Sequence, residues 1–108
     1  MAREVKRGEL WTYAFSAPDK RRPVLVLTRN EVIGLLDTVT VAPVTSTIHG
    51  APSEVVVGAE TGLKNASAIN LDHIQTVVRS RLERCIGRLD ETRMDEVCRA
   101  MEIALGCR

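Results

Sequence analysis

The apolar residues of this chain alternate with polar ones near its N-terminus. In the segment 4–15, EVKRGELWTYAF, the residues Trp11, Tyr13 and Phe15 follow one another at a period of two. This spacing places all three rings on one face of a strand. They are the chain's only aromatic residues, so an RNA-binding sheet with scattered stacking rings is disfavoured. We predict a strand whose aromatic face packs into the core.

Further strands are expected after a polar loop, SAPDKRR, at residues 16–22. Pro23 stands at the start of the next segment, where a strand tolerates proline. Val24 to Thr28 is apolar on both faces, as in a strand that is covered on both sides. The remaining segments of strand character are 38–44, 53–57 and 66–78, the last forming one or two strands, with turns at 49–52 and 60–62.

The C-terminal segment has a helical period instead. From Asp90 onward, apolar residues recur at steps of three and four, with Asp90 as N-cap and Gly106 as stop. The predicted buried face consists of Met94, Val97, Cys98, Met101 and Leu105. Five or six short strands followed by one helix predict a mainly β fold with a C-terminal helix, built as a small, strongly bent barrel. Residues 1–108 form a single domain in this interpretation.

Composition narrows the class of protein. Apolar residues make up 44% and charged residues 27% of the 108 residues, and the formal net charge is +1. These values are ordinary for a globular protein, and they exclude a highly basic nucleic-acid coat protein while leaving room for a local basic groove. No apolar run approaches the ~20 residues of a membrane span, and the N-terminus lacks a secretory h-region. We therefore expect a cytoplasmic protein with no membrane association.

The three cysteines do not suggest a metal site or a disulfide framework. Cys85, Cys98 and Cys107 are odd in number and lack CxxC spacing. His49 and His73 would not complete a zinc site with them. We predict no metal and no cofactor.

Two polar clusters offer candidate chemistry. Lys20, Arg21 and Arg22 precede one buried strand, and Thr45-Ser46-Thr47 follow the next. If these strands are antiparallel neighbours, the start of one lies beside the end of the other, and Arg22 meets Thr45. A guanidinium beside a hydroxyl suits a phosphodiester, since arginine offers a planar fork to the non-bridging oxygens. A solvated basic turn and a strand-end cap are the alternative explanation.

The histidines form a second candidate constellation. Two histidines can divide the acid and base roles in phosphodiester cleavage. The sequence does not place His49 near His73. Of the two, His73 in the segment LDHIQT is the better candidate.

Several motifs, taken in order, resemble the MazF/PemK family of toxin endoribonucleases. They are RGELW at 7–11, RPVLVL at 22–27, VAPVTS at 41–46, GL at 62–63, SAI at 67–69, LDHI at 71–74, RL at 81–82, IGRL at 86–89 and the closing helix around Met94. The resemblance covers nearly the whole chain.

This resemblance implies an SH3-like (CcdB/PemK-type) barrel that forms a homodimer. It implies a toxin that cuts single-stranded RNA at short sequences without metal and is inhibited by a cognate antitoxin through a disordered acidic and apolar C-terminal segment. The family's catalytic arginine and threonine fall on Arg22 and Thr45. The implied reaction is attack by the ribose 2′-hydroxyl on the adjacent phosphorus.

Two departures from the family pattern concern the general base. The loop before Arg22 is short, so Asp19 is the only acid that it offers. Asp72-His73 stands where relatives often have Asp-Gln, so Asp72 and His73 are candidates for catalytic support. The residues expected to hold the RNA are Lys20, Arg21, Ser46, Thr47, Gln75 and Arg79.

Two rival functions remain open at this stage. Toxins that poison DNA gyrase share the barrel, but they rely on a tryptophan-containing C-terminal tail, and this chain ends in ALGCR. The other rival is a non-catalytic barrel that binds RNA or protein.

Overall fold

The fold is seen in a computed structural model that describes residues 4–16 and 21–107. Seven strands, short helical turns and one long helix follow each other along the chain. Their bounds are β1 Glu9–Ala14, β2 Arg21–Val26, α1 Asn30–Ile33, β3 Thr38–Thr45, β4 Glu54–Val57, η1 Ala59–Thr61, β5 Ser67–Asn70, η2 Leu71–His73, β6 Gln75–Val78, η3 Arg79–Arg81, β7 Leu82–Arg88 and α2 Glu91–Leu105. The prediction of a mainly β fold with a C-terminal helix is confirmed.

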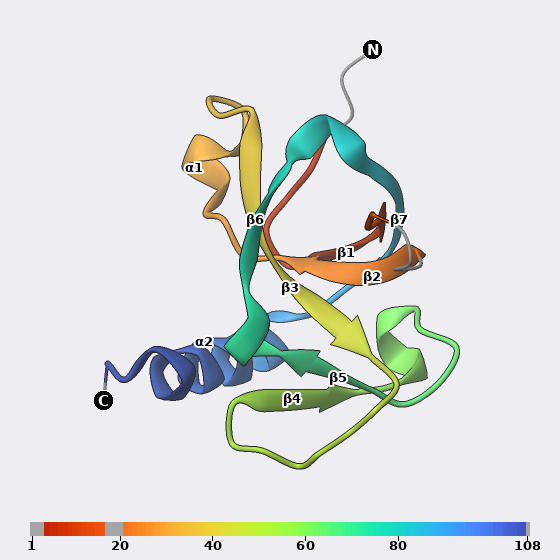
Figure 1. Cartoon of the computed structure of the whole chain (residues 1–108), viewed down its shortest axis with the longest axis vertical. Coiled ribbons are helices and arrows are strands. Elements are labelled where there is room, and N and C mark those ends of the chain that lie inside the picture. Colours follow the sequence, from red (N-terminus) through yellow and green to blue (C-terminus); the bar gives the residue numbers. More distant parts are fainter. Residues whose placement is uncertain (1–3, 17–20, 108) are drawn as a thin grey trace.

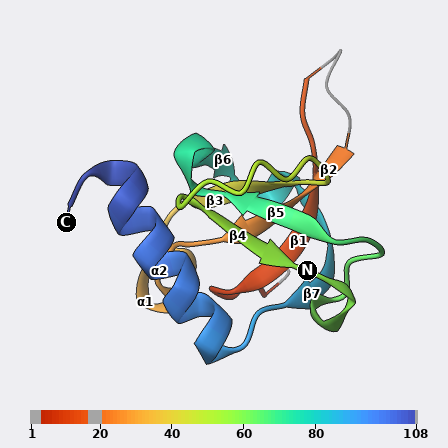
Figure 2. The same ribbon diagram turned by 90° about the horizontal axis from the view of Figure 1, so that it is seen from below.

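The sheet is built around β3. Its strand order is β4-β5-β3-β2-β1-β7, and β6 also pairs with β3. The N-terminal half of β3 pairs with β6 and its C-terminal end pairs with β5, so the sheet divides at this strand. All recorded pairings are antiparallel. Figures 1 and 2 show the strands bending around a common centre in a barrel-like arrangement, with α2 lying across one end near β4 and β5.

Two apolar clusters fill the two sides of β2. Leu25 packs with β4, β5 and α2 in one cluster, whereas Val24 and Val26 point into the other. All three side chains are fully buried, as the apolar pattern on both faces predicts. Trp11 and Tyr13 belong to the second cluster with 4% and 6% of their surface exposed, so the predicted aromatic core stripe is confirmed for these two residues. Phe15 lies just beyond β1 and is only partly buried against the same cluster.

The helix α2 has the predicted ends. The Asp90 side chain accepts a hydrogen bond from the Arg93 N–H at 2.9 Å, and Gly106 adopts a left-handed φ of 71° after the last turn. Val97 is buried in the predicted face, but Leu105 is 58% exposed, so its placement there was wrong. It stands at the last position of α2, and the helix contacts β4 and η2 with its buried residues Val97 and Ala100. Among the described residues, no helix is long and apolar enough to cross a membrane.

Three local predictions need correction. Arg21 and Arg22 were expected in a loop, but they are the first residues of β2, opposite Ala14 and Tyr13 of β1. A single helical turn, α1, lies between β2 and β3, where no helix was predicted. The strand β7 was not predicted, because only Leu82 of its seven residues is buried and no apolar alternation marks it.

Candidate functional site

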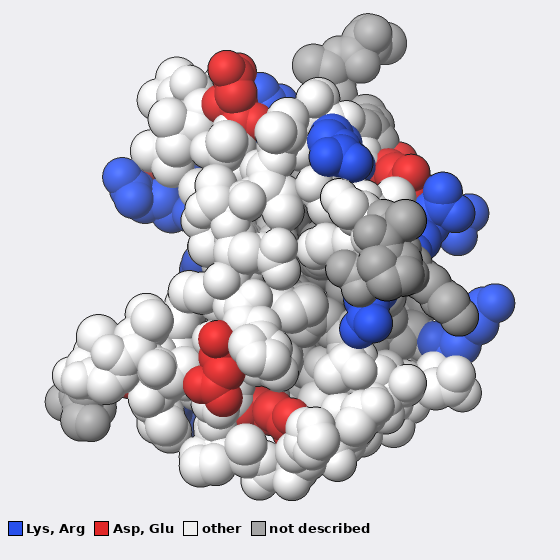
Figure 3. Space-filling view, viewed as in Figure 1, with Lys and Arg blue, Asp and Glu red and all other residues white. Residues whose placement is uncertain are grey.

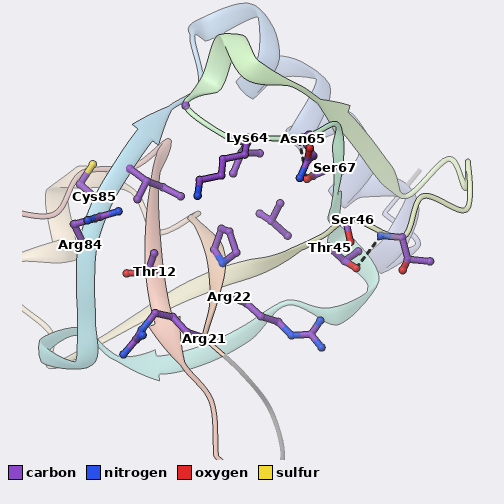
Figure 4. A pocket seen from close by; sticks show the side chains of 16 residues that line it. Thr12, Arg21, Arg22, Thr45, Ser46, Lys64, Asn65, Ser67, Arg84 and Cys85 are labelled. Carbon is purple, nitrogen blue, oxygen red and sulfur yellow. Dashed lines mark hydrogen bonds between the residues drawn. The ribbon is translucent and has the colours of Figure 1, made fainter.

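A cleft of about 790 Å³ opens at the end of the sheet where β2 begins and β3 ends. Its walls come from five segments of the chain, shown in Figure 4. The lining residues are Thr12, Arg21, Arg22, Pro23, Val44, Thr45, Ser46, Thr47, Gly62, Leu63, Lys64, Asn65, Ser67, Arg84, Cys85 and Ile86. This set includes four cationic side chains and no carboxylate, so the cleft suits an anionic ligand.

The strand register brings Arg22 and Thr45 together. The β2–β3 ladder pairs Val24 with Pro43, and two residues further along each strand stand Arg22 and Thr45. Both residues line the cleft. In Figure 4 the Arg22 side chain extends toward the side of the cleft that carries Thr45 and Ser46. The juxtaposition expected from antiparallel neighbours is present.

Arg22 and its neighbour Arg21 have different surroundings. Arg21 points the other way in Figure 4 and forms an ion pair with Glu83 of β7. The hydrogen bond and the charge of Glu83 raise the pKa of Arg21 above its ordinary value. Arg22 is exposed and has no ion pair or hydrogen bond from its side chain within the described part of the chain. Its guanidinium is therefore free to bind a ligand.

The hydroxyl of Thr45 is oriented by the turn that follows β3. Its Oγ1 accepts a hydrogen bond from the backbone N–H of Thr47 at 3.1 Å, drawn as a dashed line in Figure 4. Because the oxygen serves as acceptor, the hydroxyl proton can be donated to a ligand in the cleft. Ser46 and Thr47 are exposed beside it and also line the cleft.

The opposite side of the cleft holds residues that the sequence analysis did not identify. Lys64 follows the η1 turn and Arg84 lies on β7, and both are exposed. In the view of Figure 3, Lys and Arg side chains lie on the right of the molecule, where β2 and β7 lie in Figure 1. Cys85, next to Arg84, also lines the cleft, and burial raises the pKa of its thiol. No local sequence signal marks this group, because it assembles only through tertiary structure.

Asp72 and His73 lie away from this cleft. They form η2 at the end of β5 that is remote from Ser67, on the side where α2 packs. The Asp72 carboxylate accepts a hydrogen bond from Ser53, and His73 Nδ1 lies 3.2 Å from Asn70 Nδ2. Neither residue lines the cleft of the single chain. Their supporting role in catalysis therefore stays a prediction.

The other residues predicted to bind RNA or to act in catalysis lie in separate parts of the structure or outside the described residues. Gln75 begins β6 and does not line the cleft, and Arg79 donates from its side chain to the Leu36 carbonyl at 3.2 Å in a separate depression near α1. The backbone N–H of His49 donates to Glu54 in the β3–β4 connection. Asp19 and Lys20 lie outside the described residues.

Comparisons with known proteins agree with the fold. Residues 6–105 match the family model described as PemK-like, MazF-like toxin of type II toxin–antitoxin system. The chain is 42% identical over 103 residues to the probable endoribonuclease MazF5 of Mycobacterium tuberculosis, covering 94% of this chain and 93% of the relative.

Solved structures of similar proteins include toxins and their complexes. The M. tuberculosis toxin MazF-mt6 superimposes with a TM-score of 0.84 at 37% identity, over 91% of this chain and 96% of the other. A MazE-MazF structure from Deinococcus radiodurans superimposes with a TM-score of 0.80 at 28% identity, over 94% and 96% of the two chains.

Proposed function

The chain belongs to the PemK-like, MazF-like toxin family of type II toxin–antitoxin systems, and from this premise we propose that it is an endoribonuclease that cuts single-stranded RNA in the cleft at the end of β2 and β3. One observation carries the proposal. The guanidinium of Arg22, which has no partner among the described residues, and the oriented hydroxyl of Thr45 stand at the same end of the β2–β3 ladder, in a cleft lined by cations. Relatives such as MazF5 bear the name of endoribonucleases, in agreement with this assignment.

The reaction that suits this pair is internal transesterification. The ribose 2′-hydroxyl loses its proton and attacks the adjacent phosphorus, and the bond from phosphorus to the 5′-oxygen breaks. The products are a 2′,3′-cyclic phosphate and a free 5′-hydroxyl, whose oxygen takes up a proton. Arg22 binds the non-bridging oxygens as negative charge accumulates on them, and Thr45 donates a hydrogen bond to the same group. Because a guanidinium neutralises this charge, the mechanism requires no metal. DNA lacks the nucleophile.

The general base is not assigned to a residue of the cleft. A threonine hydroxyl is far too weak an acid to ionise near neutral pH, so Thr45 would not serve alone as the base. We retain Asp19, Asp72 and His73 as candidates for proton transfer. An RNA-cleavage pH profile that is unchanged by His73→Ala would exclude the histidine.

The proposal includes recognition of short RNA sequences and two protein partners. Ser46 and Thr47 can form hydrogen bonds with a base next to the scissile phosphate, since both are exposed in the cleft. Gln75 and Arg79 are proposed to contact more distant nucleotides. A second copy forms the homodimer, and an antitoxin with a disordered acidic and apolar C-terminal segment blocks the cationic cleft in the cytoplasm. The similar MazE-MazF structure from Deinococcus radiodurans supports such a pairing by analogy.

The test is incubation of the purified protein with mixed single-stranded RNA in the presence of EDTA. We expect fragments with 2′,3′-cyclic phosphate and 5′-hydroxyl ends, and we expect single-stranded DNA of the same sequence to stay intact. Fragments with 5′-phosphate ends, or cleavage abolished by EDTA, would contradict the mechanism. Intact RNA with gyrase-dependent DNA breaks would support a gyrase poison, and intact RNA without such breaks would support a non-catalytic binding module.

A further inference from the structure

Two of the four cationic residues that line the cleft, Lys64 and Arg84, neither act in the proposed reaction nor pair with an acidic side chain of the described residues. Arg22 is assigned to the scissile phosphate, and Arg21 is held by Glu83. Lys64 and Arg84 face the same space from the turn after η1 and from β7. Neither forms an ion pair or a side-chain hydrogen bond within residues 4–16 and 21–107. No ion pair or hydrogen bond of these two side chains with a described residue therefore stabilises the fold.

A contact between two glycines fixes the position of this second pair. A Cβ added to Gly87 would stand 1.7 Å from the Thr61 carbonyl oxygen, and a Cβ added to Gly62 would stand 2.2 Å from the Ile86 carbonyl oxygen. Gly62 also has a φ of 97°, which glycine adopts without strain. Only glycine at both positions lets the η1 turn lie directly against β7. Because these two segments are in direct backbone contact, Lys64 and Arg84 are held on the same wall of the cleft.

The wall is anchored in the core as well as at its surface. Leu63, next to Lys64, is 7% exposed and belongs to the cluster beneath β5 and α2. Thr61, two residues before Leu63, is also buried, and its hydroxyl donates to the Gly58 carbonyl at 2.7 Å. A charge mounted on such a segment loses little backbone entropy when it binds a ligand.

The dimensions of the cleft exceed those needed for one phosphate. Its volume of about 790 Å³ lies toward the upper part of the range of roughly 300–1,000 Å³ that ligand pockets occupy. An RNA strand brings one negative charge with each nucleotide, and cations along a groove add affinity by releasing counterions. Arg22 on one side and the pair Lys64 and Arg84 on the other match a strand that presents more than one phosphate.

We propose that Lys64 and Arg84 together bind one backbone phosphate of the RNA that flanks the scissile phosphate. This inference rests on the proposed function for the identity of the ligand. The pair acts in binding and register, whereas Arg22 and Thr45 act in the chemical step. Since both cations contact the same phosphate, their contributions to affinity are coupled.

The test is the binding of a mixed-sequence 2′-O-methyl RNA, which keeps its phosphates but has no free 2′-hydroxyl. The dissociation constant is measured as a function of salt for the wild type, Lys64→Ala, Arg84→Ala and the double variant, with Arg99→Ala as control. Arg99 is an exposed arginine of α2 that does not line the cleft. Each single variant should bind about tenfold more weakly at low salt. The double variant should reduce the salt slope by about 0.7, the value for one phosphate of a single strand.

Three results distinguish the inference from the function on which it rests. If the fold-loss of affinity in the double variant is smaller than the product of the two single fold-losses, a shared phosphate is supported. If the fold-losses multiply, the two cations attract RNA independently and the inference is overturned. Binding by both single variants equal to that of Arg99→Ala also overturns it. If the variants show the predicted losses in affinity and change of slope but the wild type cuts no RNA, the nuclease assignment fails and the phosphate site is still supported. In cleavage assays, the KM of Arg84→Ala should rise by a larger factor than its kcat falls.

Discussion

Arg22 and Thr45 stand across from each other where β2 begins and β3 ends, two residues beyond the pairing of Val24 with Pro43. One supplies an exposed guanidinium and the other a hydroxyl that the Thr47 N–H holds in place. The two β-strands place a cation and a hydrogen-bond donor at one cleft without relying on a long loop. This arrangement suits catalysis by electrostatic stabilisation, which requires groups that are already in position before the reaction.

The hydroxyl of Thr45 should contribute to the chemical step. We expect Thr45→Val to lower kcat for RNA cleavage by on the order of 10²-fold, the loss that follows removal of one donor to a developing oxyanion. Thr45→Ser keeps the hydroxyl and should retain most of the rate. Thr92→Val, on the exposed first turn of α2, is the matched control. A Thr45→Val enzyme as fast as the control would remove this residue from the mechanism.

The contact between Gly62 and Gly87 should be essential for stability. In Gly87→Ala the new Cβ would overlap the Thr61 carbonyl oxygen at 1.7 Å, and only backbone movement relieves this overlap. We expect a loss of about 2–4 kcal/mol in the free energy of unfolding, measured by urea denaturation. Gly34→Ala is the control, since nothing lies within 4 Å of its added Cβ. Equal stability of the two variants would show that the η1 turn and β7 are not in direct contact.

The N-terminal cap of α2 offers a second stability test. Asp90→Ala removes the hydrogen bond to the Arg93 N–H and should lower stability by about 1 kcal/mol. In a domain of this size such a loss lowers Tm by about 4–8 °C. Asp95→Ala, at an exposed position on the same helix, should change stability by less than about 0.5 kcal/mol. A Tm for Asp90→Ala that equals that of Asp95→Ala would contradict the cap.

The thiol of Cys85 can report occupancy of the cleft. Burial raises its pKa, so little thiolate is present near neutral pH, and alkylation by iodoacetamide should accelerate as the pH rises through the raised pKa. We expect 2′-O-methyl RNA to slow the alkylation of Cys85 at constant pH, because this residue lines the cleft. Cys107 is exposed near the chain end and does not line it, so its rate should not change. Peptide mass spectrometry measures both rates, and protection of Cys107 alone would place the RNA elsewhere.

The sequence predicted those parts of the fold that local patterns encode. The strand β3 and the helix α2 have clear apolar periods and caps, and both were predicted within a residue or two. Arg22 and Thr45 could be brought together because antiparallel neighbours place a strand's start beside its partner's end. The aromatic stripe followed from alternation alone.

The rest depended on tertiary contacts that no local pattern encodes. The strand β7 is exposed over most of its length and is held by pairing with β1, so its sequence lacks a buried face. Lys64 and Arg84 belong to one cleft only because Gly62 and Gly87 allow two backbones to touch. The pairing of Arg21 with Glu83 likewise joins β2 to a strand that was not predicted.

The most direct test of the central claim is the rate of RNA cleavage in EDTA by Arg22→Ala, compared with Arg99→Ala and the wild type. Because Arg22 is exposed and its side chain has no partner among the described residues, the variant should keep its fold, with a thermal unfolding transition close to that of the wild type. We predict that Arg22→Ala loses at least about 10²–10³ in kcat, that Arg22→Lys recovers part of it, and that Arg99→Ala is fully active. A folded Arg22→Ala protein that cuts RNA at the wild-type rate would contradict the account.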